Sequence, residues 1–493
     1  MNDKLNKPVL FELRKYLLTH LGLNFSEKQE RELIQRIEPA AKEFEFKDMF
    51  KFVEWLLKNK ATNKQIEVLA SYLTIGETYF LRVQKSFEFL ERTFIPNLIQ
   101  KKGRDGKQLR IWSAGCASGE EPYTIAITLL RTIPNIKDWN ITILATDINP
   151  VLLKKAEKGI YSKWSFRNNP SWFFSGYFKK VGDSRYQILP KVKNMVTFAP
   201  LNLVKDMYPS LINNTNAMDI IFCRNVMIYF SQTGIKEVVN RLYKSLLPGG
   251  ILIVSPVETS NVLSKKFSKI DYCGQTIYQK EIIEQVKVKT YNRFVPEFSH
   301  TDEIVKDTAN KNAVIKDNIP EKLPIDNKIK QVSNYEQAVA LFKQGLFEQA
   351  EKLLTSLLIH DKKNQKQIVT LLAKTKANIG KLDEARLLCE RGLALDKSDY
   401  SLYYLIATIL QEQGNDEEAI SSLKKAIYLD HNFALAHFLL GNINVKRGHN
   451  STGKKYFNNA INILSHYNPD EIVPESDGLT VGRFTEIISA IKT

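Results

Sequence analysis

The chain has 493 residues, of which 43% are hydrophobic, and a formal net charge of +16 at pH 7. This length predicts about three domains, and the hydrophobic content excludes a disordered chain. The sequence shows no basic start followed by a long apolar run and no stretch of about 18 continuous apolar residues, so we expect a cytoplasmic protein without a transmembrane segment. Four widely spaced cysteines, with no C-x-x-C pair, argue against a disulfide framework and a structural zinc site: Cys116, Cys223, Cys273 and Cys389.

The positive charge is unevenly distributed along the chain. Residues 1–105 carry 19 basic and 15 acidic residues, residues 106–290 carry 25 and 13, and residues 291–493 carry 26 of each. A basic middle domain beside a neutral one suggests an acidic macromolecular partner for the first and a different partner for the second. Charge alone leaves nucleic acid and an acidic protein surface both open.

The first part of the chain has the pattern of helices. From residue 8 to about 72, apolar residues recur at helical spacing, and Ser26 followed by Gln29 indicates a helix start. This predicts an N-terminal helical domain over residues 1–85. The apolar positions include Leu10, Leu13, Leu17, Leu21, Leu33 and Ile37.

The middle of the chain, residues 86–290, alternates between strand-like and helical stretches, which predicts an α/β domain with a mostly parallel sheet. The glycines and Pro248 in LLPGG are expected to end a helix and turn into the last strand. Alternation around Gly182–Asp183 predicts a hairpin in a small inserted β-subdomain over about 176–200. The strand-like runs are Leu109–Ser113, Ile141–Thr146, Ile220–Cys223 and Gly250–Ser255.

The last part of the chain contains a repeat. Residues 291–333 have little periodicity and are expected to form a linker. Four glycines then follow at spacings of 35, 34 and 34 residues, and an alanine comes five residues after each of the first three. This period is typical of tetratricopeptide repeats, an all-α solenoid that binds proteins or peptides. We expect the repeats over 334–466 and a C-terminal tail over 467–493; the glycines are Gly345, Gly380, Gly414 and Gly448.

The segment LRIWSAGCASGEEPY, from Leu109 to Tyr123, is the first candidate for a binding site. A strand ends in small residues, and a helix then begins with Glu120 and Glu121. Gly115 allows close approach of the backbone, and the helix N-terminus offers free N–H groups. Two carboxylates would repel a pyrophosphate but suit a ligand with a positive end, such as S-adenosylmethionine. An ordinary strand–turn–helix is the alternative.

Three further segments end at the same edge of the predicted sheet. Asp147 in LATDIN ends the second strand, where an acidic side chain holds ribose hydroxyls or simply caps the next helix. Asn202 in PLNLVKD is placed to contact an adenine edge. DIIFCRNVMIYF carries Arg224, Asn225 and Tyr229 to the carboxyl ends of the strands, where ligands bind.

The blocks SGEEPY, TDIN, LNL and FCRNVMIYF, with TIGETYFLR at 74–82, resemble the CheR-type chemoreceptor glutamate methyltransferases over residues 8 to 285. The resemblance implies a Rossmann-like, metal-free enzyme that transfers a methyl group from S-adenosylmethionine to glutamates, leaving S-adenosylhomocysteine. It implies that the substrates are the cytoplasmic helices of methyl-accepting chemotaxis receptors, which would recruit the enzyme to membrane arrays. No nucleic-acid partner is expected.

The matching motifs assign roles to individual residues. Arg82 would hold the substrate carboxylate in two hydrogen bonds, and Tyr229 would donate a further one. Gly76 and Leu81 depart from the asparagine and phenylalanine frequent in the family. Cofactor binding is assigned to Thr78, Arg82, Gly115, Glu120, Asp147, Asn202, Leu203, Arg224 and Asn225, and catalysis to Arg82, Tyr229 and Arg224.

The expected chemistry needs no proton shuttle. A glutamate is already ionised near neutral pH, so catalysis should depend on orientation and on the exclusion of water. The stretch from Tyr177 to Asn202 is short for the family, which favours recognition without a receptor tether peptide; the repeats would then supply targeting.

Two other functions stay open at this point. A nucleic-acid methyltransferase would explain the basic domain, but the chain has CRNV where amino-methylating enzymes carry an Asp/Asn-Pro-Pro-aromatic segment. A non-catalytic scaffold that senses S-adenosylmethionine is the other alternative.

Overall fold

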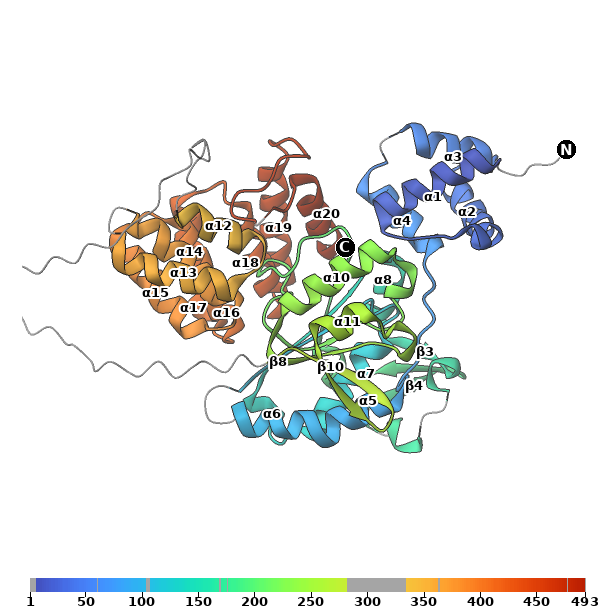
Figure 1. Ribbon diagram of the computed structural model, residues 1–493, viewed down its shortest axis with the longest axis horizontal. Coiled ribbons are helices and arrows are strands. Elements are labelled where there is room, and N and C mark those ends of the chain that lie inside the picture. Colours follow the sequence, from blue (N-terminus) through green and yellow to red (C-terminus); the bar gives the residue numbers. More distant parts are fainter. Residues whose placement is uncertain are drawn as a thin grey trace, which may run out of the picture.

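The computed structural model describes residues 6–59, 61–102, 107–167, 170–174, 176–281, 334–361, 364–476 and 478–492. The chain forms an N-terminal group of helices, an α/β domain and a C-terminal array of paired helices (Figure 1). The linker expected over 291–333 lies outside the described residues. Within the described part of the chain, no helix is long and apolar enough to cross a membrane.

The N-terminal helices form where their caps and apolar stripes predict. The Asn6 side chain accepts the Val9 N–H at the start of the first helix, and Ser26 and Gln29 form a capping box before the second. The predicted apolar positions are buried together in one core. The helices are α1 Lys7–Leu21, η1 Glu27–Gln29, α2 Glu30–Glu43, α3 Met49–Lys58 and α4 Asn63–Leu73.

The α/β domain confirms the predicted parallel sheet. Seven strands have the order β6-β2-β1-β7-β8-β10-β9, in which the first five are parallel and the last two form an antiparallel edge. The strands are β1 Gln108–Ala114, β2 Asn140–Asp147, β6 Val196–Pro200, β7 Met218–Phe222, β8 Leu246–Ile253, β9 Ser268–Tyr272 and β10 Gln275–Gln279. The helices are α5 Gln84–Phe89, η2 Leu90–Phe94, α6 Ile95–Lys102, α7 Glu120–Thr132, α8 Pro150–Lys158, α10 Gln232–Ser245 and α11 Asn261–Lys266.

The expected role of Pro248 is wrong. Helix α10 already ends at Ser245, and LLPGG forms the first part of β8. There the pairing with β7 shifts register, and Pro248, which has no N–H to donate, lies in the irregular part. A Cβ at Gly250 would lie 2.9 Å from the Leu247 carbonyl oxygen, so this bulge requires glycine.

The β-subdomain contains the predicted hairpin, but its bounds differ from the prediction. Strands β4 Phe178–Val181 and β5 Arg185–Ile188 pair around the turn, and β3 Ile160–Ser162 adds a third strand. The strand at the other end, β6, instead pairs with β2 in the main sheet, after the short helix α9 Pro190–Lys193. Alternation along the chain predicts a strand but does not say which strand it pairs with.

The repeats form four helix pairs, as the period predicts. Each of the four glycines lies in the turn within a pair with a positive φ, between 67° and 83°, and the alanines after the first three are buried. The helices are α12 Asn334–Lys343, α13 Phe347–His360, α14 Gln365–Asn378, α15 Leu382–Leu395, α16 Tyr400–Glu412, α17 Asp416–Leu429, α18 Ala434–Lys446 and α19 Asn450–Leu464.

The expected C-terminal tail is a further helix, α20 Val481–Lys492. Its residues Val481, Phe484 and Ile488 are buried in the core of the repeats. The tail is therefore structured, because its apolar residues are buried against α18 and α19. Figure 1 shows α20 between the repeats and the N-terminal helices.

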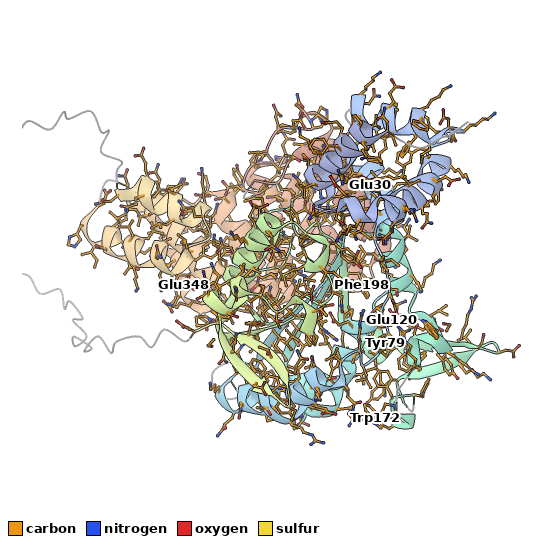
Figure 2. The ribbon with its side chains drawn as sticks, turned by 45° about the vertical axis from the view of Figure 1, so that its right-hand side comes forward. Glu30, Tyr79, Glu120, Trp172, Phe198 and Glu348 are labelled. Carbon is orange, nitrogen blue, oxygen red and sulfur yellow. The ribbon has the colours of Figure 1, made fainter. Side chains whose placement is uncertain are left out.

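The repeats dock on the α/β domain at the amino ends of its strands. The buried Glu412 carboxylate lies 3.6 Å from the Arg110 guanidinium of β1, and the Glu412 carbonyl accepts hydrogen bonds from Gln108 and Asn140. Lys280 lies 3.4 Å from Glu348, which Figure 2 labels at this boundary. The carboxyl ends of the strands, at the opposite edge of the sheet, are left for a site.

Candidate active site

A pocket opens at the carboxyl ends of the parallel strands, between the α/β domain and the end of α1. About 970 Å³ of space lies between its walls when the open mouth is counted. Leu21 and Leu23, which the sequence analysis did not assign to the site, contribute an apolar wall from the N-terminal domain. Nine of the predicted site residues line it together: Thr78, Arg82, Gly115, Asp147, Asn202, Leu203, Arg224, Asn225 and Tyr229.

The floor of the pocket is backbone. Gly115 has a φ of 83°, and a Cβ there would lie 2.3 Å from a Val226 methyl group. The N–H groups of Gly115 and Cys116 donate to the Thr146 carbonyl at 2.7 and 2.9 Å. The turn after β1 therefore has no room for a side chain at Gly115, and the backbone itself lines the pocket.

Asp147 shapes this turn. One carboxylate oxygen accepts the Ala117 N–H at 2.8 Å and the other accepts the Asn149 N–H at 2.9 Å. The alternative that Asp147 caps the next helix is wrong, because Asn149 is the N-cap of α8. Burial raises the pKa of Asp147. Each carboxylate oxygen keeps a second lone pair, which a ligand hydroxyl can use.

The two glutamates that open α7 point in different directions. Glu121 lines the pocket, where it accepts hydrogen bonds from Ser113 at 2.7 Å and from Arg224 at 3.2 Å. Glu120 does not line it: its buried carboxylate accepts hydrogen bonds from Ser118 at 2.7 Å and Ser165 at 3.0 Å. Consecutive helical residues face about 100° apart, so only one of the two reaches the pocket. The structure therefore places Glu121 where the sequence prediction placed Glu120.

Glu120→Gln is expected to stabilise the fold at neutral pH. Burial raises the pKa of Glu120, so the folded state holds this proton more tightly than the unfolded chain. Stability from this group therefore falls as the pH rises above the ordinary carboxyl value of about 4.3. Chemical denaturation of the wild type and of Glu120→Gln between pH 5 and 8 should show a higher free energy of unfolding for the variant. The difference should become smaller as the pH falls. A gain independent of pH, or one shared by Glu237→Gln, whose side chain is 60% exposed, would contradict this account.

Arg224 supports other site residues. Its side chain is only 2% exposed, and it donates to Glu121 and, at 2.5 Å, to the Arg82 carbonyl oxygen. Its Nε has no hydrogen-bond partner in the structure. These contacts make Arg224 a positioning residue, and its predicted catalytic role stays a prediction.

Arg82 lies in a strained segment. Leu81 and Val83 on either side have φ values of 54° and 56°, a left-handed conformation that costs roughly 1–3 kcal/mol for such residues. The Arg82 guanidinium donates to the Glu77 carbonyl oxygen at 2.8 Å and lies 5.7 Å from the centre of the Tyr79 ring. The backbone bond from Arg224 holds this conformation and keeps Arg82 at the pocket.

Glu258 organises the loop that carries Asn225, and the sequence analysis missed it. Its carboxylate accepts the N–H groups of Asn225, Val226 and Met227 at 2.7, 2.7 and 2.8 Å. It also accepts the hydroxyl and N–H of Ser255, with which it forms a capping box. The S-x-x-E spacing of Ser255 and Glu258 was the signal that could have identified it.

Glu258→Ala is expected to destabilise the fold by about 3–5 kcal/mol, because it leaves several buried N–H groups without an acceptor. Denaturant unfolding measures the loss. Glu237→Ala, on the exposed face of α10, is the matched control and should change stability by no more than about 0.5 kcal/mol. A loss of less than 1 kcal/mol for Glu258→Ala would show that water replaces these contacts.

Asn202 and Tyr229 lie where the N-terminal helices meet the α/β domain. Asn202 is largely engaged already: its side-chain oxygen accepts the Val204 and Lys205 N–H groups at 3.0 and 3.3 Å. The Tyr229 carbonyl accepts the Asn24 N–H at 2.8 Å. Burial raises the pKa of Tyr229, so its phenol is a hydrogen-bond donor at neutral pH.

The polar and apolar side chains of the lining together suit a nucleoside with a cationic tail. The lining combines leucine and isoleucine side chains with Glu121, Asp147 and Asn202. No histidine is among the described residues of the lining, and no group of three or more metal-ligating side chains occurs in the described ranges. Burial raises the pKa of Cys116 well above its usual value, so its thiol is neutral.

The comparisons with known proteins agree with this geometry. The family model "CheR methyltransferase, SAM binding domain" matches residues 76–276, and a tetratricopeptide repeat model matches 407–448. The chain is 34% identical over 261 residues to the chemotaxis protein methyltransferase of Borreliella burgdorferi, covering 52% of this chain and 90% of that protein. Chemotaxis protein methyltransferase 2 of Vibrio cholerae is 32% identical, covering 54% and 91%.

One relative extends beyond the α/β domain. The probable biofilm formation methyltransferase WspC of Pseudomonas aeruginosa is 26% identical over 389 residues, which cover 78% of this chain and 83% of that protein. The match therefore includes part of the repeat region. With the family model on the α/β domain and relatives above 30% identity covered almost whole, the chain belongs to the CheR methyltransferase family and is an S-adenosylmethionine-dependent methyltransferase.

Proposed function

We propose that this protein methylates glutamate side chains of chemotaxis receptors. The observation that carries the proposal is Arg82, whose guanidinium lines the same pocket as Asp147 and Asn202. One of its nitrogens binds the Glu77 carbonyl, and its other N–H groups are suited to a carboxylate. The names of the relatives from Borreliella burgdorferi and Vibrio cholerae support a receptor of this kind as the substrate.

The proposed cofactor contacts follow the lining of the pocket. Asp147 would accept the ribose hydroxyls, and Asn202 and Leu203 would contact the adenine. Glu121, in place of Glu120, would face the cationic tail. Gly115 would present bare backbone to the ligand, because Val226 occupies the space that a Cβ would need.

The residues of the site position and shield the reacting groups. S-adenosylmethionine, when bound, supplies a sulfonium methyl group that a carboxylate oxygen attacks in line, leaving S-adenosylhomocysteine. Arg82 holds the substrate carboxylate at the angle for this attack, and the neutral Tyr229 phenol donates a hydrogen bond beside it. Leu21, Leu23 and Ile148 exclude water. A glutamate is already ionised at neutral pH, so the lining needs no general base.

The repeats are proposed to bind a protein or peptide that brings the enzyme to its receptor. Their position at the amino ends of the strands leaves the mouth of the pocket accessible to substrate. Independence from a receptor tether peptide stays a prediction.

The test uses the full-length protein, S-adenosylmethionine labelled in the methyl group, and membranes that contain the host's chemoreceptors. We expect label in the receptor band that base releases as methanol, as a glutamate methyl ester requires. Base-stable label would indicate a different acceptor. Binding of S-adenosylhomocysteine without methyl transfer would favour a non-catalytic scaffold that senses the cofactor. Label in added nucleic acid would favour a nucleic-acid methyltransferase.

A further inference from the structure

The C-terminal helix α20 reaches from the repeats to both of the domains that form the pocket. Phe484 anchors it by packing edge-to-face on Phe438 of α18, with ring centres 5.1 Å apart. The backbone N–H groups of Val481 and Gly482 bind the carbonyls of Glu471 and Pro469. The start of the helix is thus fixed to the segment that follows the last repeat, one residue before Arg483.

Arg483 forms ion pairs with two other domains at once. Its guanidinium lies 2.9 Å from Glu67 of α4, in the N-terminal domain, and 3.1 Å from Asp206, in the α/β domain. Glu486, on its own helix, is 3.4 Å away. All of these side chains are largely buried, and the Arg483 Nε has no hydrogen-bond partner in the structure. Buried pairs of this kind are costly to break from one side, because an uncompensated charge remains.

Asp206 connects this cluster to the pocket. The carboxylate oxygen that accepts from Arg483 also accepts the Asn202 N–H at 2.8 Å. The Asn202 carbonyl in turn accepts the Asp206 N–H at 2.8 Å. Arg483 is therefore connected to Asn202, a residue of the pocket lining, through a single oxygen atom of Asp206.

Glu67 connects the same arginine to the other wall. Helix α4 packs in one core with α1, whose end contributes Leu21 to the pocket. Nearby, Gly22 lies directly against Val204, two residues before Asp206. The two walls of the pocket thus belong to separate domains, and Arg483 binds one carboxylate from each.

We propose that Arg483 is a positioning residue that holds the N-terminal domain closed over the cofactor pocket, so that the repeat array sets the affinity for the cofactor. The inference rests on the proposed cofactor site. It requires no contact between Arg483 and the ligand. It also gives the repeats a mechanical connection to the catalytic domain, because a partner that displaces α20 would withdraw the arginine.

The first experiment measures S-adenosylhomocysteine binding by calorimetry with the full-length protein. Glu67→Gln removes only the negative charge that the N-terminal domain contributes to the cluster. It should raise the Kd for S-adenosylhomocysteine about tenfold, because the closed state becomes less populated. Arg483→Leu should raise it at least as much. The effect of Arg483→Leu in the Glu67→Gln background should be smaller than in the wild type, because both changes release the same contact.

Steady-state kinetics separate positioning from a loss of folded protein. In both variants the KM for S-adenosylmethionine should rise by the same factor as the Kd while kcat stays within about twofold; loss of folded enzyme would lower kcat and leave KM unchanged. Arg483→Lys should recover part of the affinity, since one ammonium group reaches only one of the two carboxylates.

The matched control is Arg447→Leu. Arg447 pairs with Glu417 at 2.5 Å wholly within the repeats, and its loss should leave Kd and KM unchanged. Wild-type affinity in both Glu67→Gln and Arg483→Leu would overturn the inference, as would an equal loss in Arg447→Leu. Failure of the wild-type protein to bind S-adenosylhomocysteine would instead contradict the proposed cofactor site itself.

Discussion

Replacing Arg82 by alanine is expected to lower the rate of methyl transfer by a factor of about 100 to 1,000, the usual effect of removing one fixed charged donor from an active site. Arg82 lies in the pocket with only one of its nitrogens bound to a backbone carbonyl, so it can hold a carboxylate. Its loss should lower kcat more than it lowers the affinity for S-adenosylhomocysteine. The base-labile methanol assay with receptor membranes measures the rate.

The control for this prediction is Arg92→Ala. Arg92 is exposed on η2, in the same stretch of chain, and does not line the pocket. It should retain the full rate. An Arg82→Ala enzyme with more than a tenth of the wild-type rate would show that orientation of the substrate carboxylate depends on another group.

The second large effect is expected at Asp147. Asp147→Ala removes the acceptor for the Ala117 and Asn149 N–H groups, and each lost charged hydrogen bond costs roughly 1.5–3 kcal/mol. The turn that forms the floor of the pocket would lose its shape, and the carboxylate proposed to bind the ribose hydroxyls would be absent. We expect S-adenosylhomocysteine to bind at least about 100-fold more weakly.

Calorimetry on Asp147→Ala, Asp147→Asn and Asp138→Asn checks this expectation. Asp147→Asn should also bind S-adenosylhomocysteine weakly, because the side-chain NH₂ group would face one of the two N–H donors, Ala117 or Asn149. Asp138, whose side chain is 53% exposed at the far end of the same domain, should tolerate the change. Affinity of Asp147→Asn within threefold of wild type would show that the turn holds its shape without the charge.

The sequence predicted the residues of the pocket better than it predicted their contacts. Asp147 ends a strand, and Asn202 and Arg224 come two residues after strands. The carboxyl ends of parallel strands meet at one edge, so local pattern alone brings these residues together. Which oxygen or nitrogen of each is already occupied depends on neighbours far along the chain. Arg224 illustrates this: its guanidinium is engaged by Glu121 and by the backbone of Arg82.

Glu120 and Glu121 show the limit of a motif at the level of single residues. The two carboxylates are adjacent in sequence, and composition gives no reason to prefer one. The hydroxyl of Ser165, from the segment after β3, donates a hydrogen bond to the buried Glu120 carboxylate. Only the packing of the β-subdomain against α7 decided which glutamate faces the ligand space.

The sequence by itself determined the order of domains, the parallel sheet, the helix pairs and the family, because periodicity, turn glycines and short motifs are local signals. The tertiary structure alone decided that β6 joins the main sheet, that the C-terminal segment forms α20, and that Arg483 meets Glu67 and Asp206. Residues 67, 206 and 483 are separated by more than a hundred positions, and no local pattern connects them. Their meeting follows from the burial of apolar faces between domains, which a chain acquires only when it is folded.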